Sequence, residues 1–305
     1  MTEVLRLHAH RAILGEGPTW RPRENAIYWI DLRAPAIFRY DCGSGAQQTL
    51  QVALGDRLGA MVFTTDGRMV VADRGGLHLV DGASGERRQL AHPDSAQALN
   101  CFNDAKCDGR GRLWSGSADT KDTDANGSLF VFDRQAHGRR IDSGFTCSNG
   151  PAFSPDGRRA YFTDSYAFEI WCYELDPASG EIGPRQSFAK VAPEDGYPDG
   201  MTVDAEGFLW NAHWDGWRVT RYDPDGRIDR VLKVPVPKPT SIAFGGPDMK
   251  RLYITSASLD MNPQQLAEAP WSGCLMACDL DVTGVLDHDF DLGAILDVSG
   301  GLVTP

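Results

Sequence analysis

The sequence predicts an all-β fold, a six-bladed β-propeller. Apolar or aromatic residue pairs recur along the chain ahead of small or polar residues, and they begin at Tyr28, Val70, Leu113, Tyr161, Leu209 and Leu252. Successive pairs lie 42 to 48 residues apart, a period typical of propeller blades. A second apolar run follows each pair and ends in Asp. Because both runs alternate instead of repeating at helical spacing, we expect two central strands per repeat with shorter flanking strands.

The other elements of the repeat follow in the same order along the chain. Turn sequences precede most pairs, namely TTDGR, DGRGR, SPDGRR, DAEG and GPDMKR, and they suit a tight connection into a strand. The runs that close with Asp are IFRYD, LHLVD, SLFVFD, IWCYELD, RVTRYD and CLMACD. Near the two ends, EVLRL (3–7) and LGAILDV (292–298) are each able to form a strand. We expect these end segments to pair and close the ring, which removes an exposed sheet edge.

Length and composition favour one globular domain over residues 1–305, because closed β folds run long. The formal net charge of −12 argues against binding to nucleic acid or to anionic membrane surfaces, and suits either cation binding or solubility. No stretch approaches the roughly 20 apolar residues that span a bilayer, and the first residues do not resemble a signal peptide. The seven cysteines lack a CxxC pair and indicate free thiols in a reducing, cytoplasmic compartment.

Four polar residues occupy nearly the same place in their repeats. Glu16, Asn103, Asn149 and Asp199 each stand 10 to 12 residues before the apolar pair of their repeat, just ahead of the strand that we expect before the turn. In the two remaining repeats the equivalent positions are Gly59 and Thr240 with Ser241. Corresponding points of successive blades meet around the central channel of a propeller. We therefore expect the four polar side chains to face one another there, although each of the motifs FND, SNG and PDG alone is an ordinary turn sequence.

Carboxylate and carboxamide oxygens are hard ligands that suit Ca²⁺, Mg²⁺ or Mn²⁺, with Zn²⁺ accessible through the carboxylates. Two acids and an Asn do not saturate such an ion, so water and substrate have room to bind, as at a catalytic metal. Such a site favours ester or lactone hydrolysis, in which Asp199 could both ligate the ion and accept a proton from water. The chain has no GxSxG, P-loop or HExxH motif. No histidine is placed to activate Cys101 or Cys147, for which packing is the simpler interpretation.

Several segments together resemble the gluconolactonase, regucalcin and luciferin-regenerating-enzyme family of six-bladed propellers. They are LGEGPTWRPRENAIYWIDL, FNDAKCDGRGRLWSGS, SNGPAFSPDGRRAYFTDS, PDGMTVDAEGFLWNAHWDG and SIAFGG, in the order and approximate spacing of the family. The resemblance implies that Glu16, Asn149 and Asp199 bind one divalent metal ion and that Asn103 holds substrate or metal. It also implies that Asp199 is the catalytic acid or base, and that sugar-acid lactones are opened to aldonic acids.

This chain departs from the family at one position. Regucalcin-like members carry Arg two residues before the Asn of the FND motif, whereas this chain has Cys101, and the acid that those proteins use on the following loop falls near Lys121. The departure bears on the choice of sugar. Two loops, 119–127 and 259–273, interrupt the regular spacing and are candidates for a rim or lid over the channel, with a solvated surface loop as the alternative.

The resulting prediction is a metal-dependent lactonase that acts on a pentonolactone or gluconolactone. Two alternatives remain open at this point. One is a divalent-metal-dependent esterase or phosphotriesterase, because a fold does not fix a function. The other is a Ca²⁺-binding propeller without catalysis. A small-molecule sugar lactone is the expected partner, and neither nucleic acid nor a membrane is expected.

Overall fold

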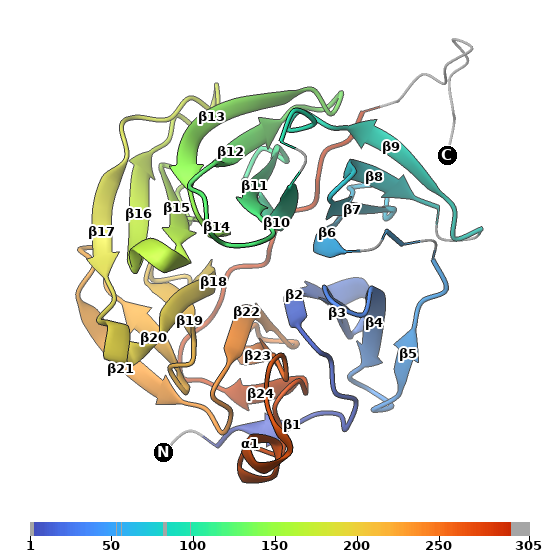
Figure 1. Ribbon diagram of the computed structural model, residues 1–305, viewed down its shortest axis with the longest axis vertical. Helices are drawn as coiled ribbons and strands as arrows, with labels where there is room; N and C mark the ends of the chain where they lie inside the picture. Colours follow the sequence, from blue (N-terminus) through green and yellow to red (C-terminus); the bar gives the residue numbers. More distant parts are fainter. Residues whose placement is uncertain (1–2, 53, 56, 82–83, 98, 294–305) are drawn as a thin grey trace.

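The computed structural model describes residues 3–52, 54–55, 57–81, 84–97 and 99–293 of the chain. These residues form six four-stranded antiparallel sheets around a central axis, as Figure 1 shows. In five sheets the strands follow chain order outward from the centre. The prediction of a six-bladed β-propeller is therefore confirmed, and each sheet is one blade.

The first three blades take up the N-terminal half of the chain. Blade one contains β2 (Gly15–Arg21), β3 (Ala26–Asp31), β4 (Ala36–Asp41) and β5 (Gln47–Thr49). Blade two contains β6 (Leu58–Phe63), β7 (Met69–Asp73), β8 (Gly76–Val80) and β9 (Arg87–Ala91). Blade three contains β10 (Asn100–Cys107), β11 (Leu113–Asp119), β12 (Gly127–Phe132) and β13 (Gly138–Phe145).

The other three blades follow in order around the ring. Blade four contains β14 (Ser148–Phe153), β15 (Arg159–Asp164), β16 (Glu169–Glu174) and β17 (Gln186–Lys190). Blade five contains β18 (Tyr197–Val203), β19 (Leu209–Trp214), β20 (Arg218–Tyr222) and β21 (Ile228–Lys233). Blade six contains β22 (Pro239–Gly245), β23 (Arg251–Ser256), β24 (Met276–Asp279) and the N-terminal β1 (Leu5–Arg6).

Helical structure among the described residues is short and lies in the connections. The single-turn 3₁₀ segments are η1 (Pro22–Glu24), η2 (Ser165–Ala167) and η3 (Pro193–Asp195). The helix α1 (Pro263–Glu268) begins at Asn262, whose side chain accepts a hydrogen bond from the Gln265 backbone N–H while the Gln265 side chain accepts one from the Asn262 N–H. This reciprocal capping box fixes the start of α1.

The apolar pairs that mark the repeats lie on the second strand of each blade, and all their side chains are buried. Neighbouring residues of a strand point to opposite faces of its sheet. Both faces are covered here because each blade packs between two others, as Trp114 of blade three does against Phe153 of blade four, with ring centroids 5.4 Å apart. This packing explains why two adjacent positions in every repeat are apolar.

The ring is closed within blade six. Leu5 and Arg6 of β1 pair with Ala277 and Met276 of β24, so the outermost strand of the last blade comes from the N-terminal end of the chain. The expected strand at the N-terminus is present, and it pairs with β24; the expected pairing with segment 292–298 is not tested. Residues 294–298 of that segment lie outside the described residues, and Leu292 and Gly293 are not in a strand.

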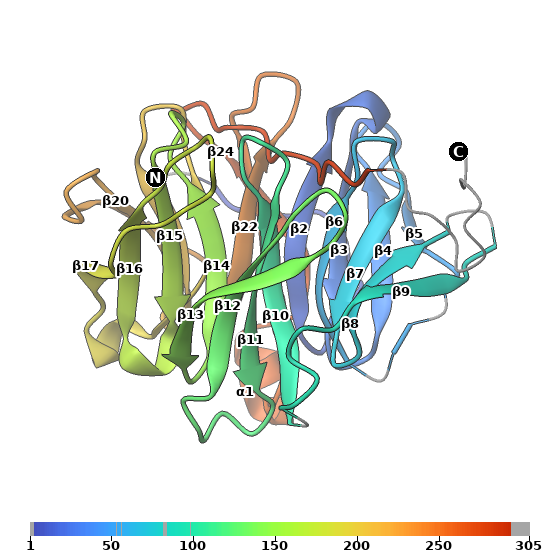
Figure 2. The ribbon, with the colours of Figure 1, turned by 90° about the horizontal axis from the view of Figure 1, so that it is seen from above.

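After β24 the chain crosses the molecule as a strap, residues 284–293. Isolated bridges join Gly284 to Asp204, His288 to Cys107 and Phe290 to Thr64, and so tie the strap to blades five, three and two. Figure 2 shows the strap and α1 on opposite faces of the ring. The strap therefore covers one end of the channel and leaves the α1 end to the loops.

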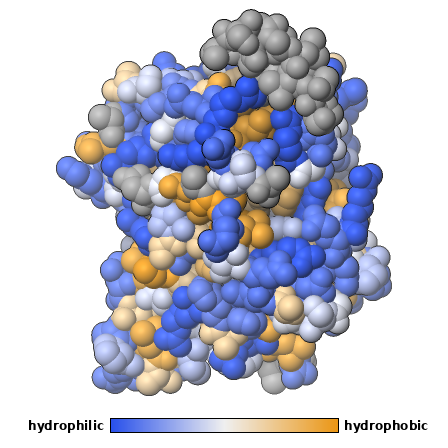
Figure 3. All heavy atoms as spheres, turned by 90° about the vertical axis from the view of Figure 1, so that its right-hand side faces the viewer, coloured by the Kyte–Doolittle hydropathy of each residue, from blue (hydrophilic) through white to orange (hydrophobic). Residues whose placement is uncertain are grey.

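Polar residues cover most of the outer wall near blade two, with apolar atoms confined to patches (Figure 3). Within the described part of the chain, no helix has the length and apolar character needed to cross a membrane.

Candidate functional site

The structure brings Glu16, Asn103, Asn149 and Asp199 together in one cavity of about 380 Å³. They come from four innermost strands, β2, β10, β14 and β18, which surround the channel in Figure 1. The connections after the second strands form the mouth of the cavity, and Leu259 and Asp260 ahead of α1 also line it. The site therefore lies at the α1 end of the channel, away from the strap.

Every innermost strand is irregular at the level of this site. The pairing register of each inner strand against its neighbour shifts at or next to the position picked out by the sequence, as between Glu16 and Thr19, between Asn149 and Ala152, and between Pro198 and Met201. The same shift occurs in β6, β10 and β22. Bulges of this kind re-aim side chains. The six aligned bulges thus turn the site residues toward the axis. In regular strands, neighbouring side chains would instead alternate between the two faces of the blade.

The sequence placed the four residues just ahead of the inner strands, whereas the structure places them inside those strands. The segments that precede two of them are held by a buried aspartate. Asp31 accepts hydrogen bonds from the backbone N–H groups of Ile13 at 2.7 Å and Leu14 at 3.2 Å. Asp164 does the same in blade four for Thr146 at 3.0 Å and Cys147 at 3.1 Å. These carboxylates fix the backbone that leads to Glu16 and Asn149.

A hydrogen-bond chain orients the two carboxamides. The Asn103 Nδ2 group donates to the Ser148 carbonyl at 2.8 Å and to Asn149 Oδ1 at 2.9 Å. Asn149 Nδ2 donates to Ser165 Oγ at 2.9 Å, and that hydroxyl donates to the Pro198 carbonyl at 2.7 Å. With both amide nitrogens engaged inside the protein, the Asn103 Oδ1 atom and the second lone pair of Asn149 Oδ1 are left to accept from or coordinate a ligand.

The two acids of the site are buried with little to balance their charge. Burial raises the pKa of both the Glu16 and Asp199 carboxyls well above the usual range, and neighbouring carboxylates raise them further, Asp199 and Asp104 for Glu16 and Asp104 for Asp199. Burial also raises the pKa of Asp104 to about 6, against the attraction of Lys106. Asp104 faces a separate small cavity and accepts a hydrogen bond from the Gly150 N–H at 3.0 Å.

The donor set suits a divalent cation. Two carboxylates without a cationic partner among the described residues gain most from a bound positive charge, and the Asn149 Oδ1 atom adds a third oxygen of the kind that hard cations prefer. Within the described part of the chain, no three His, Cys, Asp or Glu side chains gather closely enough to hold an ion. Any ion held here therefore needs the carboxamide and further ligands from water or substrate.

The cavity wall contains charged and aromatic residues that the sequence did not single out. Arg33, Arg57, Lys238, Tyr197 and Asp215 all line it. Arg33 and Asp215 lie in loops at the mouth, Arg57 and Lys238 lie directly before inner strands, and Tyr197 is the first residue of β18. All five stand beside or at the start of a predicted strand at the same end of their repeats, which is a signal that the sequence could have supplied. Trp214 also lines the cavity, whereas the buried Trp20 of β2 stacks on Tyr253.

The two irregular loops both reach the mouth of the cavity, through Asp122 in 119–127 and through Leu259 and Asp260 in 259–273. Cys101, which replaces the family's Arg, also lines the cavity and lies beside Arg57.

None of the seven cysteines, all of which lie among the described residues, forms a disulfide. Burial raises the pKa of Cys147 well above its usual value, and Asp122 and Asp199 raise it further. Among the described residues no histidine lines this cavity. A thiolate nucleophile therefore lacks the activating base that it would need.

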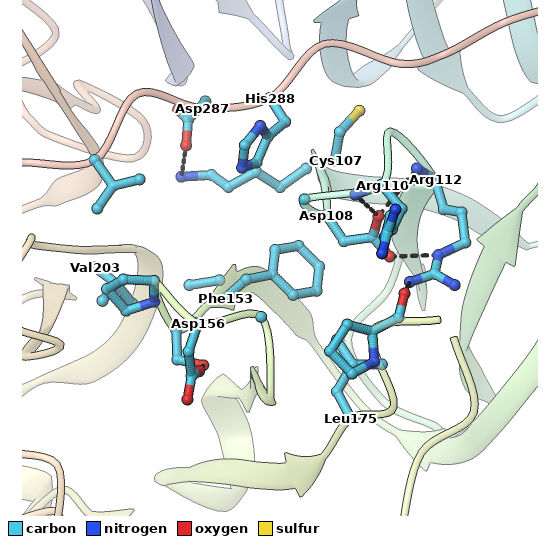
Figure 4. Close-up of a pocket in the computed structure, with 18 of the residues that line it drawn as sticks. Cys107, Asp108, Arg110, Arg112, Phe153, Asp156, Leu175, Val203, Asp287 and His288 are labelled. Carbon is cyan, nitrogen blue, oxygen red and sulfur yellow. Dashed lines mark hydrogen bonds and ion pairs between the residues drawn. The ribbon is translucent and has the colours of Figure 1, made fainter. Parts of the chain in front are cut away.

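A second cavity, of about 330 Å³, lies at the opposite end of the channel, between the strap and the turns of blades three and four (Figure 4). Asp287 of the strap pairs with Lys106 at 3.1 Å, and Arg112 pairs with Asp108 at 2.6 Å. None of the four residues selected by register lines this cavity. Its charged groups are largely satisfied by each other, in contrast to the acids at the α1 end.

The sequence of residues 14–258 matches the model of the SMP-30/gluconolactonase/LRE-like region family. The chain belongs to this family. The resemblance seen in the motifs is thus confirmed, and the match spans all four site residues.

Similar members of the family include two lactonases. A 6-deoxy-6-sulfogluconolactonase of Pseudomonas putida is 36% identical over 294 residues, covering 95% of this chain and 99% of that protein. A pentonolactonase of Haloferax volcanii is 36% identical over 247 residues, covering 81% and 82%. The crystal structure of a calcium-binding regucalcin from Agrobacterium tumefaciens superposes with a TM-score of 0.90 at 28% identity, covering 95% of this chain and 98% of that one. This family of propellers thus includes sugar lactone lactonases.

Proposed function

We propose that this protein is a metal-dependent lactonase that hydrolyses a sugar-acid lactone, such as a gluconolactone or pentonolactone, to the aldonic acid. The observation that carries the proposal is the convergence of Glu16, Asn103, Asn149 and Asp199 in one cavity. Support comes from relatives whose names state that they act on sulfogluconolactone and pentonolactone. The enzyme class is a hydrolase of carboxylic ester bonds.

Glu16, Asn149 and Asp199 would hold one divalent ion, for which Ca²⁺, Zn²⁺, Mn²⁺ and Mg²⁺ are the candidates. Such an ion polarises a lactone carbonyl and makes a bound water more acidic. The protein supplies the remaining functions. Asp199 accepts a proton from the attacking water and returns it to the departing ring oxygen, because its carboxylate has no side-chain hydrogen-bond donor among the described residues. Asn103 directs its Oδ1 atom to a sugar hydroxyl, since its Nδ2 group is fixed by Ser148 and Asn149.

The experiment measures acid release from pentono- and hexonolactones by chelator-stripped protein, with and without each ion, after subtraction of spontaneous opening. We expect turnover to return with metal. Asp199→Asn should lower kcat by about a hundredfold or more, as for loss of a general base, and should weaken metal binding in a calorimetric titration.

Asp215→Asn is the matched control, because it removes the same charge from the same cavity at an exposed position. Asp215 has a φ of 60°, which Asn tolerates well. Equal losses in both variants would contradict the assignment of Asp199. Silence on every lactone with metal bound would favour another ester or phosphotriester substrate, or a Ca²⁺-binding propeller without catalysis.

A further inference from the structure

Two arginines on one side of the cavity have guanidinium groups with no hydrogen bond or ion pair among the described residues. Arg33 follows β3 and Arg57 precedes β6, so they come from blades one and two, and both line the cavity. Within the described ranges, no hydrogen bond or ion pair engages either guanidinium. Arg57 is half-buried, which makes an unsatisfied guanidinium there costly.

The local charge balance is positive. Burial lowers the pKa of Arg57, and the nearby charge of Arg33 lowers it further, because the two like charges repel each other. Asp122 attracts both arginines, which offset the rise in its own pKa caused by burial. One carboxylate thus faces two guanidinium groups, and the imbalance favours an anion at this place.

This arginine pair lies within reach of the hydrolytic residues. The Asp122 carboxyl contacts the Cys147 thiol, and Cys147 Sγ lies 3.8 Å from the Asn149 amide nitrogen. A ligand whose reacting end lies at Asn149 can therefore present its other end to the arginines. Lys238 lines the same cavity directly before β22 in blade six, and its Nζ group is already engaged, since it donates to the Leu259 carbonyl at 3.0 Å and lies 4.6 Å from the centre of the Trp214 ring.

Resting on the lactonase activity above, we propose that Arg57 and Arg33 form an anion-binding subsite of the same cavity. The preferred substrates are then sugar lactones that carry a phosphate, sulfonate or carboxylate group at the end remote from the lactone carbonyl. A guanidinium presents its N–H groups as a planar fork that matches the oxygens of these three groups. The acidic substituent would satisfy the arginines while the carbonyl lies at the Asp199 end.

The test compares kcat/KM for 6-phosphogluconolactone and gluconolactone, which share a ring and differ in the acidic group. The lactones with a 6-sulfonate and a 6-carboxylate group identify which anion fits. Arg57→Gln should lower the ratio of kcat/KM for the phosphorylated over the neutral lactone by about tenfold to hundredfold, as for a lost charge-assisted hydrogen bond. Added salt should raise KM for the phosphorylated lactone alone, because salt screens the attraction.

Two further variants distinguish specific binding of the anion at the arginines from a general effect of the positive charge in the cavity. Lys238→Gln removes the same charge from a cavity-lining residue of blade six whose Nζ group is already engaged, and it should leave the ratio within a few-fold of the wild-type value. Asp122→Asn removes the competing carboxylate and should raise the ratio. Equal losses on both lactones in Arg57→Gln, or equal effects of Arg57→Gln and Lys238→Gln on the ratio, would overturn the subsite.

The outcomes also separate the subsite from the lactonase activity itself. Turnover of gluconolactone with an unchanged ratio overturns the subsite only. If no lactone is opened, calorimetric titration with 6-phosphogluconate and gluconate still decides, since the wild-type protein should bind the phosphorylated acid more tightly and Arg57→Gln should lose that preference. Equal affinity for the two acids would overturn the subsite.

Discussion

Buried carboxylates of the same kind behave differently according to their neighbours. Asp31 is 2% exposed and accepts hydrogen bonds from four backbone N–H groups, so its charge is satisfied inside the protein. Asp199 is 7% exposed, the Asp104 carboxylate raises its pKa beyond the effect of burial, and among the described residues the Gly200 N–H is the group that lowers it. Asp31 therefore stabilises the fold, whereas the carboxylate of Asp199 would be stabilised further by a nearby positive charge. Burial alone does not identify a site, but burial without donors does.

His213 gives a prediction at the same scale. It is 1% exposed, Nδ1 lies 3.0 Å from the Asp195 carbonyl, and burial lowers its pKa from 6.5 to about 4. Between pH 6.5 and 4, His213 is protonated in the unfolded chain but stays neutral in the folded protein. The free energy of unfolding therefore falls as pH falls. The contribution reaches about 3 kcal/mol.

Urea unfolding of the wild-type protein and of His213→Gln at several pH values measures this effect. The acids raised by burial contribute equally to both proteins, so the difference between the two free energies of unfolding isolates the histidine. As pH falls from 6.5 to 4, we expect the free energy of unfolding of the wild-type protein to fall more steeply than that of His213→Gln. A difference independent of pH would show that His213 is protonated in the folded state.

At the scale of the element, the aligned bulges demand small residues where inner strands approach each other. Gly59 lies in the bulge of β6, and a Cβ there would fall within 3 Å of the carbonyl carbon and oxygen of Phe102, next to Asn103 on β10. Backbone atoms cannot yield as a flexible side chain can. At this register position blade two therefore contributes close packing, while the other blades with a site residue there contribute a polar side chain.

Gly59→Ala should push β6 away from β10 and shift Asn103. We expect a loss of about 1 to 3 kcal/mol in the free energy of unfolding, as for other overpacked positions, together with a higher KM for the lactone. Urea unfolding and steady-state kinetics measure the two effects. Gly43→Ala is the control, because Gly43 is exposed and a Cβ there meets only ordinary contacts at 3.4 Å. Its effect should stay within about 0.5 kcal/mol, and an equal effect at both sites would refute the steric argument.

The sequence predicted the number of blades and the site register because both depend on a repeat that simple periodicity reveals. It did not predict that Glu16 and Asn149 lie inside bulged strands. A Gly-Pro pair follows Glu16, and Gly150 and Pro151 follow Asn149; within a strand these residues mark a bulge, but alone they also suit a turn. The sequence did not predict that Arg57 lines the cavity, because Arg57 lies beside Cys101 but belongs to a different blade. Such neighbours depend on closure of the whole ring, and no local pattern records them.

At the scale of the whole molecule, two connections hold the ring together. One is β1, which completes blade six beside β24. The other is the strap, which leaves blade six and reaches blades five, three and two. Phe290 is the anchor of the strap, since it is fully buried among side chains of blades two and three that include Val62, Phe102 and Phe132.

Phe290→Ala should therefore detach the strap from blades two and three and open a cavity between them. Truncation of a buried Phe costs about 3 to 5 kcal/mol, which urea unfolding would register as a lower midpoint. Leu286→Ala is the matched control, because Leu286 belongs to the same strap but is 41% exposed, and its loss should cost about 0.5 kcal/mol. Similar losses of the free energy of unfolding in the two variants would mean that the strap contacts the ring without stabilising it. A large cost for Phe290→Ala alone would show that a segment at the far end of the channel from the acids stabilises the ring that positions them.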